Sequence, residues 1–137
     1  MRMVSIMKSI SVFIAFFALI VALAAPVLAH HSFAAEFDAS KPVKVTGSVT
    51  KVEWLNPHVW FYIDVKDDSG KVSNWGIEMG SPNGLMRAGW NRKSMKVGDV
   101  VTIEGSRAKD GSNVANARAV TLAETGQMLF AASSQGQ

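Results

Sequence analysis

The strongest constraint on the fold of this chain is a strict alternation of apolar with polar or aromatic residues up to Val65. The apolar positions are Val59, Phe61, Ile63 and Val65, and the positions before and between them hold His58, Trp60, Tyr62 and Asp64. A period of two is typical of a β-strand with one face in the core and the other outside it. We therefore expect the first set to point into a hydrophobic core and the second to point outward.

The segment that follows predicts the second strand of a hairpin. Residues 67–70, Asp-Asp-Ser-Gly, are typical of a hairpin loop. The returning strand has inward residues Trp75, Ile77 and Met79, and outward residues Asn74, Gly76 and Glu78. The inward faces must coincide, since a slip by one residue turns every side chain over. The simplest register pairs Phe61 with Ile77, and its outward pairs are Trp60 with Glu78, Tyr62 with Gly76, and His58 near Gly80.

Shorter signals predict the remaining elements. A long strand starts at Val43, and its apolar parity switches before Val52, which indicates a bulge or glycine bend within residues 47–51. Ser81-Pro82 begins a short helix, with serine as the cap and proline in the first turn, and glycine favours an end near residues 89–91. Further strands are expected around Val101 and Ile103, over 114–122, and, as a short one, over 127–131.

The order of these elements predicts the fold class. Three strands, a short helix and two more strands match the OB-fold, the five-stranded oligomer-binding barrel. We expect a mostly β chain with a small five- to six-stranded antiparallel OB-like barrel over residues 43–131. An extended arm over 30–42 precedes it, and a flexible tail over 132–137 follows. A six-stranded barrel of another type, or a small sandwich, is the alternative.

The first 29 residues are typical of a signal peptide. A short segment with Arg2 and Lys8 precedes an uncharged apolar run, and the run ends in Pro-Val-Leu-Ala at residues 26–29. We expect cleavage after Ala29 and a periplasmic or secreted protein. The alternative is an uncleaved anchor, because residues 10–29 carry no charge and are long enough to span a bilayer. After cleavage we expect no membrane span.

Composition excludes several classes of function. Of the 14 basic residues two lie within residues 1–29, where there is no acid, so the rest of the 137-residue chain carries 12 basic against 11 acidic residues. Such a balance argues against a nucleic-acid partner, which needs a clustered basic face. The absence of cysteine excludes disulfides, thiolate metal sites and a cysteine nucleophile.

Several short motifs of the chain resemble a known family. They are His30-His31-Ser32-Phe33, the Val-Glu-Trp-Leu-Asn-Pro-His-Val-Trp of residues 52–60, Gly80-Ser81-Pro82-Asn83, Gly89-Trp90, Val97-Gly98-Asp99-Val100-Val101 and Ala108-Lys109-Asp110-Gly111-Ser112. Together they resemble a family of small exported bacterial proteins classed only as a domain of unknown function. The resemblance implies export and a single small β domain, and it supplies no catalytic residue.

The three histidines are candidate metal ligands. Cleavage after Ala29 would make His30 the mature N-terminus, where its α-amino and ring nitrogens can chelate Cu(II) or Ni(II) together. His31, or a more distant His58, would supply a further imidazole. The alternative is that His30 and His31 form a solvated terminus and that His58 is a strand-edge residue beside the Asn56-Pro57 turn.

The outward face of the hairpin is a candidate ligand-binding surface. OB-folds commonly bind oligomers across strands two and three, with aromatic side chains as stacking platforms. The four residues expected to form such a surface are Trp60, Tyr62, Asn74 and Glu78, with His58 at its end. The alternative is that the arm or the helix covers Trp60 and Tyr62.

Motifs for catalysis are missing from the sequence. The acids are scattered over turns and outward strand positions instead of pairing across one cleft. No Gly-x-Ser-x-Gly and no His-Glu-x-x-His occurs. The leading interpretation is a non-catalytic exported module that presents its polar and aromatic face to a small ligand or an envelope protein. A copper- or nickel-binding protein is the alternative, and a copper-dependent oxidase or oxygenase is a second alternative. The oligomeric state stays open.

Overall fold

The longest element of the computed structural model is a bent strand that takes part in both halves of the sheet. The structure describes residues 33–130, without the side chain of Phe130, so the expected signal peptide, His30, His31 and the tail lie outside the described residues. This strand, β1, covers Phe37–Glu53. Residues 37–48 pair with β4 (Val100–Ala108), and residues 48–53 pair with β2 (Trp60–Lys66).

The expected irregularity in this strand is confirmed. The register of β1 against β2 shifts between Val49 and Lys51. The shift changes which residues face inward, so that both Val49 and Val52 pack in or against the core. Gly47 lies just before it, at a place where a Cβ atom would overlap the carbonyl oxygen of Asp64.

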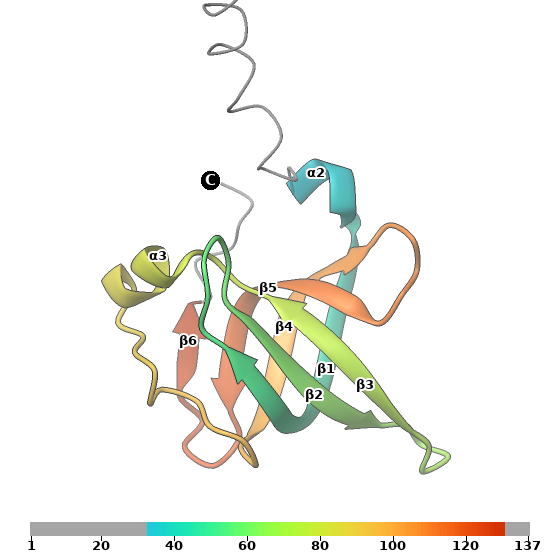
Figure 1. Ribbon diagram of the computed structural model, residues 1–137. Helices are drawn as coiled ribbons and strands as arrows, with labels where there is room; N and C mark the ends of the chain where they lie inside the picture. Colours follow the sequence, from blue (N-terminus) through green and yellow to red (C-terminus); the bar gives the residue numbers. More distant parts are fainter. Residues whose placement is uncertain (1–32, 131–137) are drawn as a thin grey trace, which may run out of the picture. The chain divides into compact units, whose positions relative to one another are not determined.

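The other elements follow in the expected order (Figure 1). They are α2 (Phe33–Glu36), β3 (Val72–Glu78), α3 (Pro82–Arg87), β5 (Val114–Leu122) and β6 (Met128–Phe130). The sheet has the strand order β3-β2-β1-β4-β5-β6, all antiparallel, and a parallel pairing of β3 with β5 closes it into a ring. A five-stranded ring with its helix between the third and fourth strands is the OB topology, which confirms the expected fold class.

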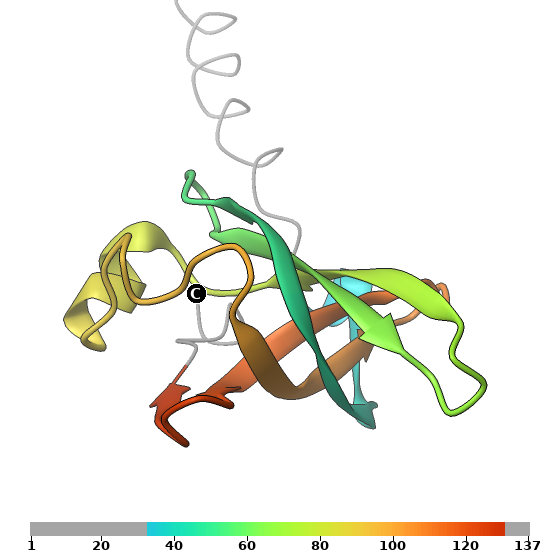
Figure 2. The same ribbon diagram turned by 90° about the horizontal axis from the view of Figure 1, so that it is seen from below.

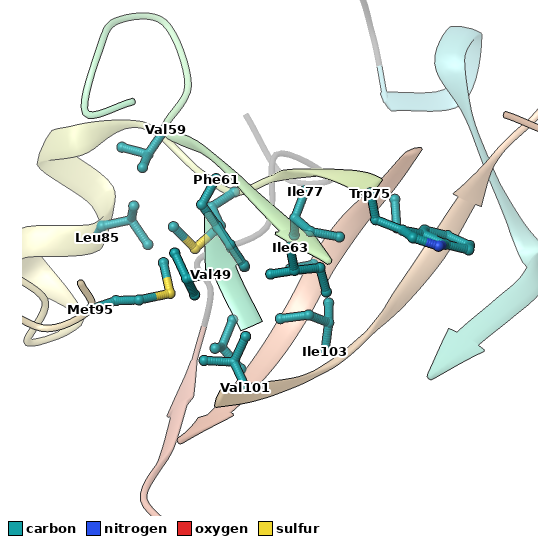
Figure 3. Close-up of a cluster of buried hydrophobic side chains, with 14 of the residues drawn as sticks. Val49, Val59, Phe61, Ile63, Trp75, Ile77, Leu85, Met95, Val101 and Ile103 are labelled. Carbon is teal, nitrogen blue, oxygen red and sulfur yellow. The ribbon is translucent and has the colours of Figure 1, made fainter. Parts of the chain in front are cut away.

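The hairpin register matches the prediction. Phe61 pairs with Ile77, Trp60 with Glu78, and Tyr62 with Gly76. The inward residues form the core, in which Phe61, Ile63 and Ile77 are fully buried. Figure 3 shows Leu85 and Met95 at one end of this cluster and Trp75 at the other. The alternation therefore set both the strand pairing and the buried face.

Helix α3 closes one end of the barrel. The hydroxyl of Ser81 caps it by accepting a hydrogen bond from the amide of Gly84 at 3.2 Å, and Pro82 occupies the first turn. Leu85 is fully buried, and Trp90, just beyond the helix, is 3% exposed. Gly89 has a φ of 93°, the left-handed conformation that commonly ends a helix. Within residues 33–130 no helix is long and apolar enough to cross a bilayer.

The structure differs from the expected arm over residues 33–42. Residues 33–36 form one helical turn, and Phe37 already begins β1, where it lies opposite Ala108. Phe37 is 2% exposed and stacks on Phe33 with 5.6 Å between the ring centroids. Burial of Phe37 extends the barrel to residue 37, six residues earlier than the alternation indicated.

Candidate functional site

Two aromatic side chains lie side by side over a glycine on the outer face of β2 and β3. A Cβ atom added to Gly76 would lie 3.5 Å from a ring carbon of Tyr62 and 3.7 Å from a ring carbon of Trp60. Both aromatic residues are half-buried. Because Gly76 has no side chain, the two rings pack over its backbone. Aromatic packing of this kind is known to stabilise strands that contain glycine.

The hydroxyl of Tyr62 is tied to the end of β1. It donates a hydrogen bond to Oε2 of Glu53 at 3.1 Å, while the ammonium of Lys51 binds Oε1 of the same carboxylate. The Lys51 ammonium also lies 5.3 Å from the centre of the Tyr62 ring. Burial first, and the hydrogen bond to Glu53 second, raise the pKa of the Tyr62 hydroxyl above its ordinary value. The bond from Lys51 lowers the pKa of the Glu53 carboxyl.

Asn74, one of the predicted ligand-binding residues, is exposed but already bound within the sheet. Its side-chain amide donates to Oδ1 of Asp64 at 2.8 Å and lies 3.3 Å from the hydroxyl of Thr50. A ligand that uses this amide must compete with Asp64. Asn74 therefore fits the rim of a binding surface better than its centre.

Glu78, another predicted ligand-binding residue, is buried and contacts a histidine. Its Oε1 binds Nδ1 of His58, and the two side chains are 5% and 15% exposed. Its neighbour in the parallel pairing is Asn116 of β5, which is also buried. Glu78 points outward in the register, as expected, but its carboxylate is enclosed where β3 meets β5.

The backbone fixes the place of His58 next to this carboxylate. The adjacent residue Val59 donates its amide to the carbonyl of Gly80 at 3.0 Å and accepts from the amide of Met79 at 2.9 Å. His58 follows the cis Asn56–Pro57 peptide at the end of the β1–β2 loop. The structure thus joins Glu78, a predicted ligand-binding residue, to His58, which was predicted both as a metal ligand and as the end of the same surface.

The other predicted metal ligands, His30 and His31, lie outside the described residues. Within residues 33–130 no three histidine, aspartate or glutamate side chains converge in a way that would hold a metal ion. A site that uses His58 would therefore need donors from elsewhere in the chain. The carboxylate partner of His58 is the part of such a site that the structure describes.

Two neighbours of the aromatic pair were not among the predicted site residues. Lys51 and Glu53 come from β1 and reach Tyr62 because the bulge after Val49 turns them to the outer face. The parity switch in the sequence was the signal for this. No local pattern in the sequence predicts the burial of Asn116, because it depends on the closure of the barrel by β3 and β5.

The described part of the expected arm, residues 33–42, does not cover Trp60 and Tyr62. Phe33 stacks on Phe37, and Phe37 lies where β1 pairs with β4, not with β2. A separate hollow of about 550 Å³ lies between the α3–β4 segment and the turn after β5, with Lys93, Lys96, Val100 and Leu122 in its wall. It shares no residue with the hairpin face.

Comparisons with known proteins bear on the family and the fold. A model described as "Family of unknown function (DUF6152)" matches residues 18–117. The chain belongs to this family. The match covers most of the barrel, from the region before β1 to within β5. No curated protein matches the chain.

One solved structure similar to this member of the family is the dimeric N-terminal domain of the PriB protein from Thermoanaerobacter tencongensis. It is 25% identical, with a TM-score of 0.44, over 61% of this chain and 96% of that chain.

Proposed function

We propose that this chain is an exported, non-catalytic protein that binds Cu(II) or Ni(II) through His58 together with the histidines of its mature N-terminus. The observation that supports the proposal is the contact between Nδ1 of His58 and the buried carboxylate of Glu78. Metal-binding histidines usually donate their second ring N–H to a carboxylate, which fixes the tautomer and the orientation of the ring. In that arrangement Nε2 of His58 is the ligand atom.

The remaining ligands would come from the start of the exported chain. After cleavage behind Ala29, His30 would offer its α-amino and imidazole nitrogens, and His31 a further imidazole. Nitrogen ligands of this kind suit Cu(II) and Ni(II). Export to the periplasm or the medium, which the proposal requires, is indicated by the first 29 residues.

A Cu(II) titration of the exported protein tests this proposal. Mass spectrometry first establishes that the chain starts at His30. We expect a one-to-one complex that loses affinity when an alanine precedes His30 and when His58 is replaced by alanine. The variant Glu78→Gln should weaken binding about 10- to 100-fold, the usual effect of losing a partner of a metal ligand. Glu104→Gln, which alters an exposed ion pair with Lys44, is the matched control.

Weak Cu(II) binding, with an affinity that is unchanged both by the added alanine and by the loss of His58, would contradict the proposal. A site limited to His30 and His31 would respond to the added alanine alone. The variants therefore distinguish a site that includes the barrel from one confined to the terminus.

A second candidate function is the binding of a small ligand or an envelope protein on the hairpin face. The observation that favours it is the pair of half-buried rings over Gly76, on the face that OB-folds commonly use. Two of the four predicted residues weaken it, because Asn74 is bound to Asp64 and Glu78 is buried. We therefore rank it second.

Photo-crosslinking in the envelope of the exporting cell tests this second candidate. A crosslinking amino acid at position 74 should give an adduct, whereas the same group at exposed position 118, in β5, should not. Trp60→Ala should abolish the adduct. An adduct that survives Trp60→Ala, or one that forms equally from position 118, would exclude the hairpin face as the binding surface.

A further inference from the structure

The stretch over residues 81–98, which begins with α3, carries four basic residues and no acidic residue. The basic residues are Arg87, Arg92, Lys93 and Lys96. Lys96 is bound to Asp99 at 2.5 Å. Among residues 33–130 no ion pair joins the other three cations to a carboxylate. Since the chain from residue 30 onward is nearly balanced in charge, these three cations give one end of the domain a distinct positive character.

Exposed apolar side chains lie next to these cations. Leu55, in the β1–β2 loop, is 62% exposed, and Met86, in α3, is 53% exposed. The guanidinium of Arg92 lies 6.0 Å from the ring centre of Trp54. This contact connects the start of the β1–β2 loop with the segment after α3. We call Trp54, Leu55, Met86, Arg87, Arg92 and Lys93 the basic–apolar surface.

This surface lies away from the β2–β3 turn of the hairpin. Figures 1 and 2 both place α3 and the β2–β3 turn at opposite ends of the barrel. The turn carries Asp67 and Asp68, both exposed. Because the exposed Lys66 and Lys71 flank these two aspartates, the turn carries no net charge. The unbalanced cations and the exposed aliphatic groups beside them lie at the α3 end.

We propose that the basic–apolar surface docks on an anionic lipid bilayer. Anionic headgroups attract lysine and arginine near the surface, and apolar side chains beside them enter the boundary between headgroups and acyl chains. Tryptophan and arginine suit that boundary because each combines an apolar body with a polar end. A nucleic-acid backbone would use the cations but would leave Leu55 and Met86 in water, so the combination favours lipid.

Cosedimentation with vesicles tests this docking surface. The protein purified from the exporting host is mixed with vesicles of phosphatidylglycerol and phosphatidylcholine, or of phosphatidylcholine alone. We expect binding to the anionic vesicles that falls as salt is raised, because salt screens exposed charges. Any attachment through residues 1–29 is the same in every variant and cancels from the comparison.

The informative variant is the double substitution Arg92→Gln with Lys93→Gln. It should lower partitioning to anionic vesicles about 25-fold, or about fivefold for each cation. The matched control is Lys66→Gln with Lys71→Gln at the opposite end, which should leave partitioning unchanged. Leu55→Ser should also reduce binding, while an unchanged thermal midpoint shows that each variant is folded.

Three results would overturn the proposal. One is equal binding to both vesicle types by all variants, and another is an equal loss of binding in the double variant and its control. The third is tight binding of a single-stranded oligothymidylate through Arg92 and Lys93 without binding to vesicles. That outcome would assign the surface to nucleic acid. The metal titration is independent of all three, since His58 and Glu78 are not part of this surface.

Discussion

Gly105 and Gly76 both lie in strands, but the space beside each α-carbon is different. A Cβ atom at Gly105 would overlap the carbonyl oxygen of Asn116 on the neighbouring strand. At Gly76 a Cβ atom would make ordinary contacts with the rings of Trp60 and Tyr62. The first glycine is required for strand packing, and the second leaves room for the aromatic side chains.

Replacement of each glycine by alanine should separate these roles. Gly105→Ala should lower the free energy of unfolding by at least ~2 kcal/mol, because backbone atoms of β4 and β5 must move apart. Gly76→Ala should change it by less than ~1 kcal/mol. Urea unfolding followed by tryptophan fluorescence measures both. Similar losses for the two variants would contradict this account of the packing.

The hydroxyl of Tyr62 should titrate above the ordinary tyrosine pKa of 10.0, because burial and the bond to Glu53 both favour the neutral form. Tyr62 is the single tyrosine of the chain, so ultraviolet absorbance of tyrosinate reports on it alone. A raised pKa means that its contribution to stability is present below about pH 10 and is lost as the pH rises through the folded value. Glu53→Gln should lower the pKa of Tyr62, whereas Glu104→Gln should not.

At the scale of elements, α3 is held to the barrel by one side of a single turn. Leu85 is fully buried against the core, whereas the next residue, Met86, is 53% exposed. A six-residue helix has little stability of its own, so packing has to hold it in place.

Alanine substitutions at these two neighbours should differ sharply. Leu85→Ala should cost about 2–5 kcal/mol of unfolding free energy, since it removes a buried side chain and leaves a cavity. Met86→Ala should cost less than about 0.5 kcal/mol. Thermal unfolding followed by circular dichroism compares them. A large loss for Met86→Ala would show that this side chain packs on the protein instead of facing solvent.

The turn before β4 should respond to acid. Hydrogen bonds from the Lys96 ammonium and from its backbone amide hold the pKa of the Asp99 carboxyl below its ordinary value of 3.8. A lowered pKa gives stability that is present above the unfolded value and is lost as the pH falls through the folded value. Asp99→Asn should therefore reduce the decline of the thermal midpoint below about pH 4. Asp68→Asn, at an exposed position in the β2–β3 turn, is the comparison. An equal change of the acid response in the two variants would contradict this account.

At the scale of the whole molecule, local sequence patterns predicted the strands and their order. Contacts between residues distant in sequence determined which further residues are buried. The hairpin register could be predicted because only one parity buries Phe61 and Ile77 together. Burial of Phe37 could not, since it depends on Ala108, which lies 71 residues later. Burial of Glu78 and Asn116 arises from the closure of β3 on β5, which no local pattern records.

The candidate site was predicted in its parts but not in its combination. The register placed His58 near Gly80, at the end of the surface that includes Glu78, but the direct contact between the two side chains was not predicted, since it depends on how the β1–β2 loop returns to β3. Trp60, Tyr62 and Gly76 were placed together because register alone determines their arrangement. Residues whose neighbours are set by strand pairing are thus predictable, and residues positioned by loops are not.

The measurement that tests the central claim most directly is electron spin-echo envelope modulation of the Cu(II)-loaded protein, purified from a bacterial host and shown by mass spectrometry to start at His30. This spectroscopy detects the remote nitrogen of an imidazole bound to copper. If His58 is a ligand, the modulation should become shallower in His58→Ala, and Glu104→Gln should leave it unchanged. Modulation identical in the parent protein and in His58→Ala would show that copper binds without this histidine and would contradict the account.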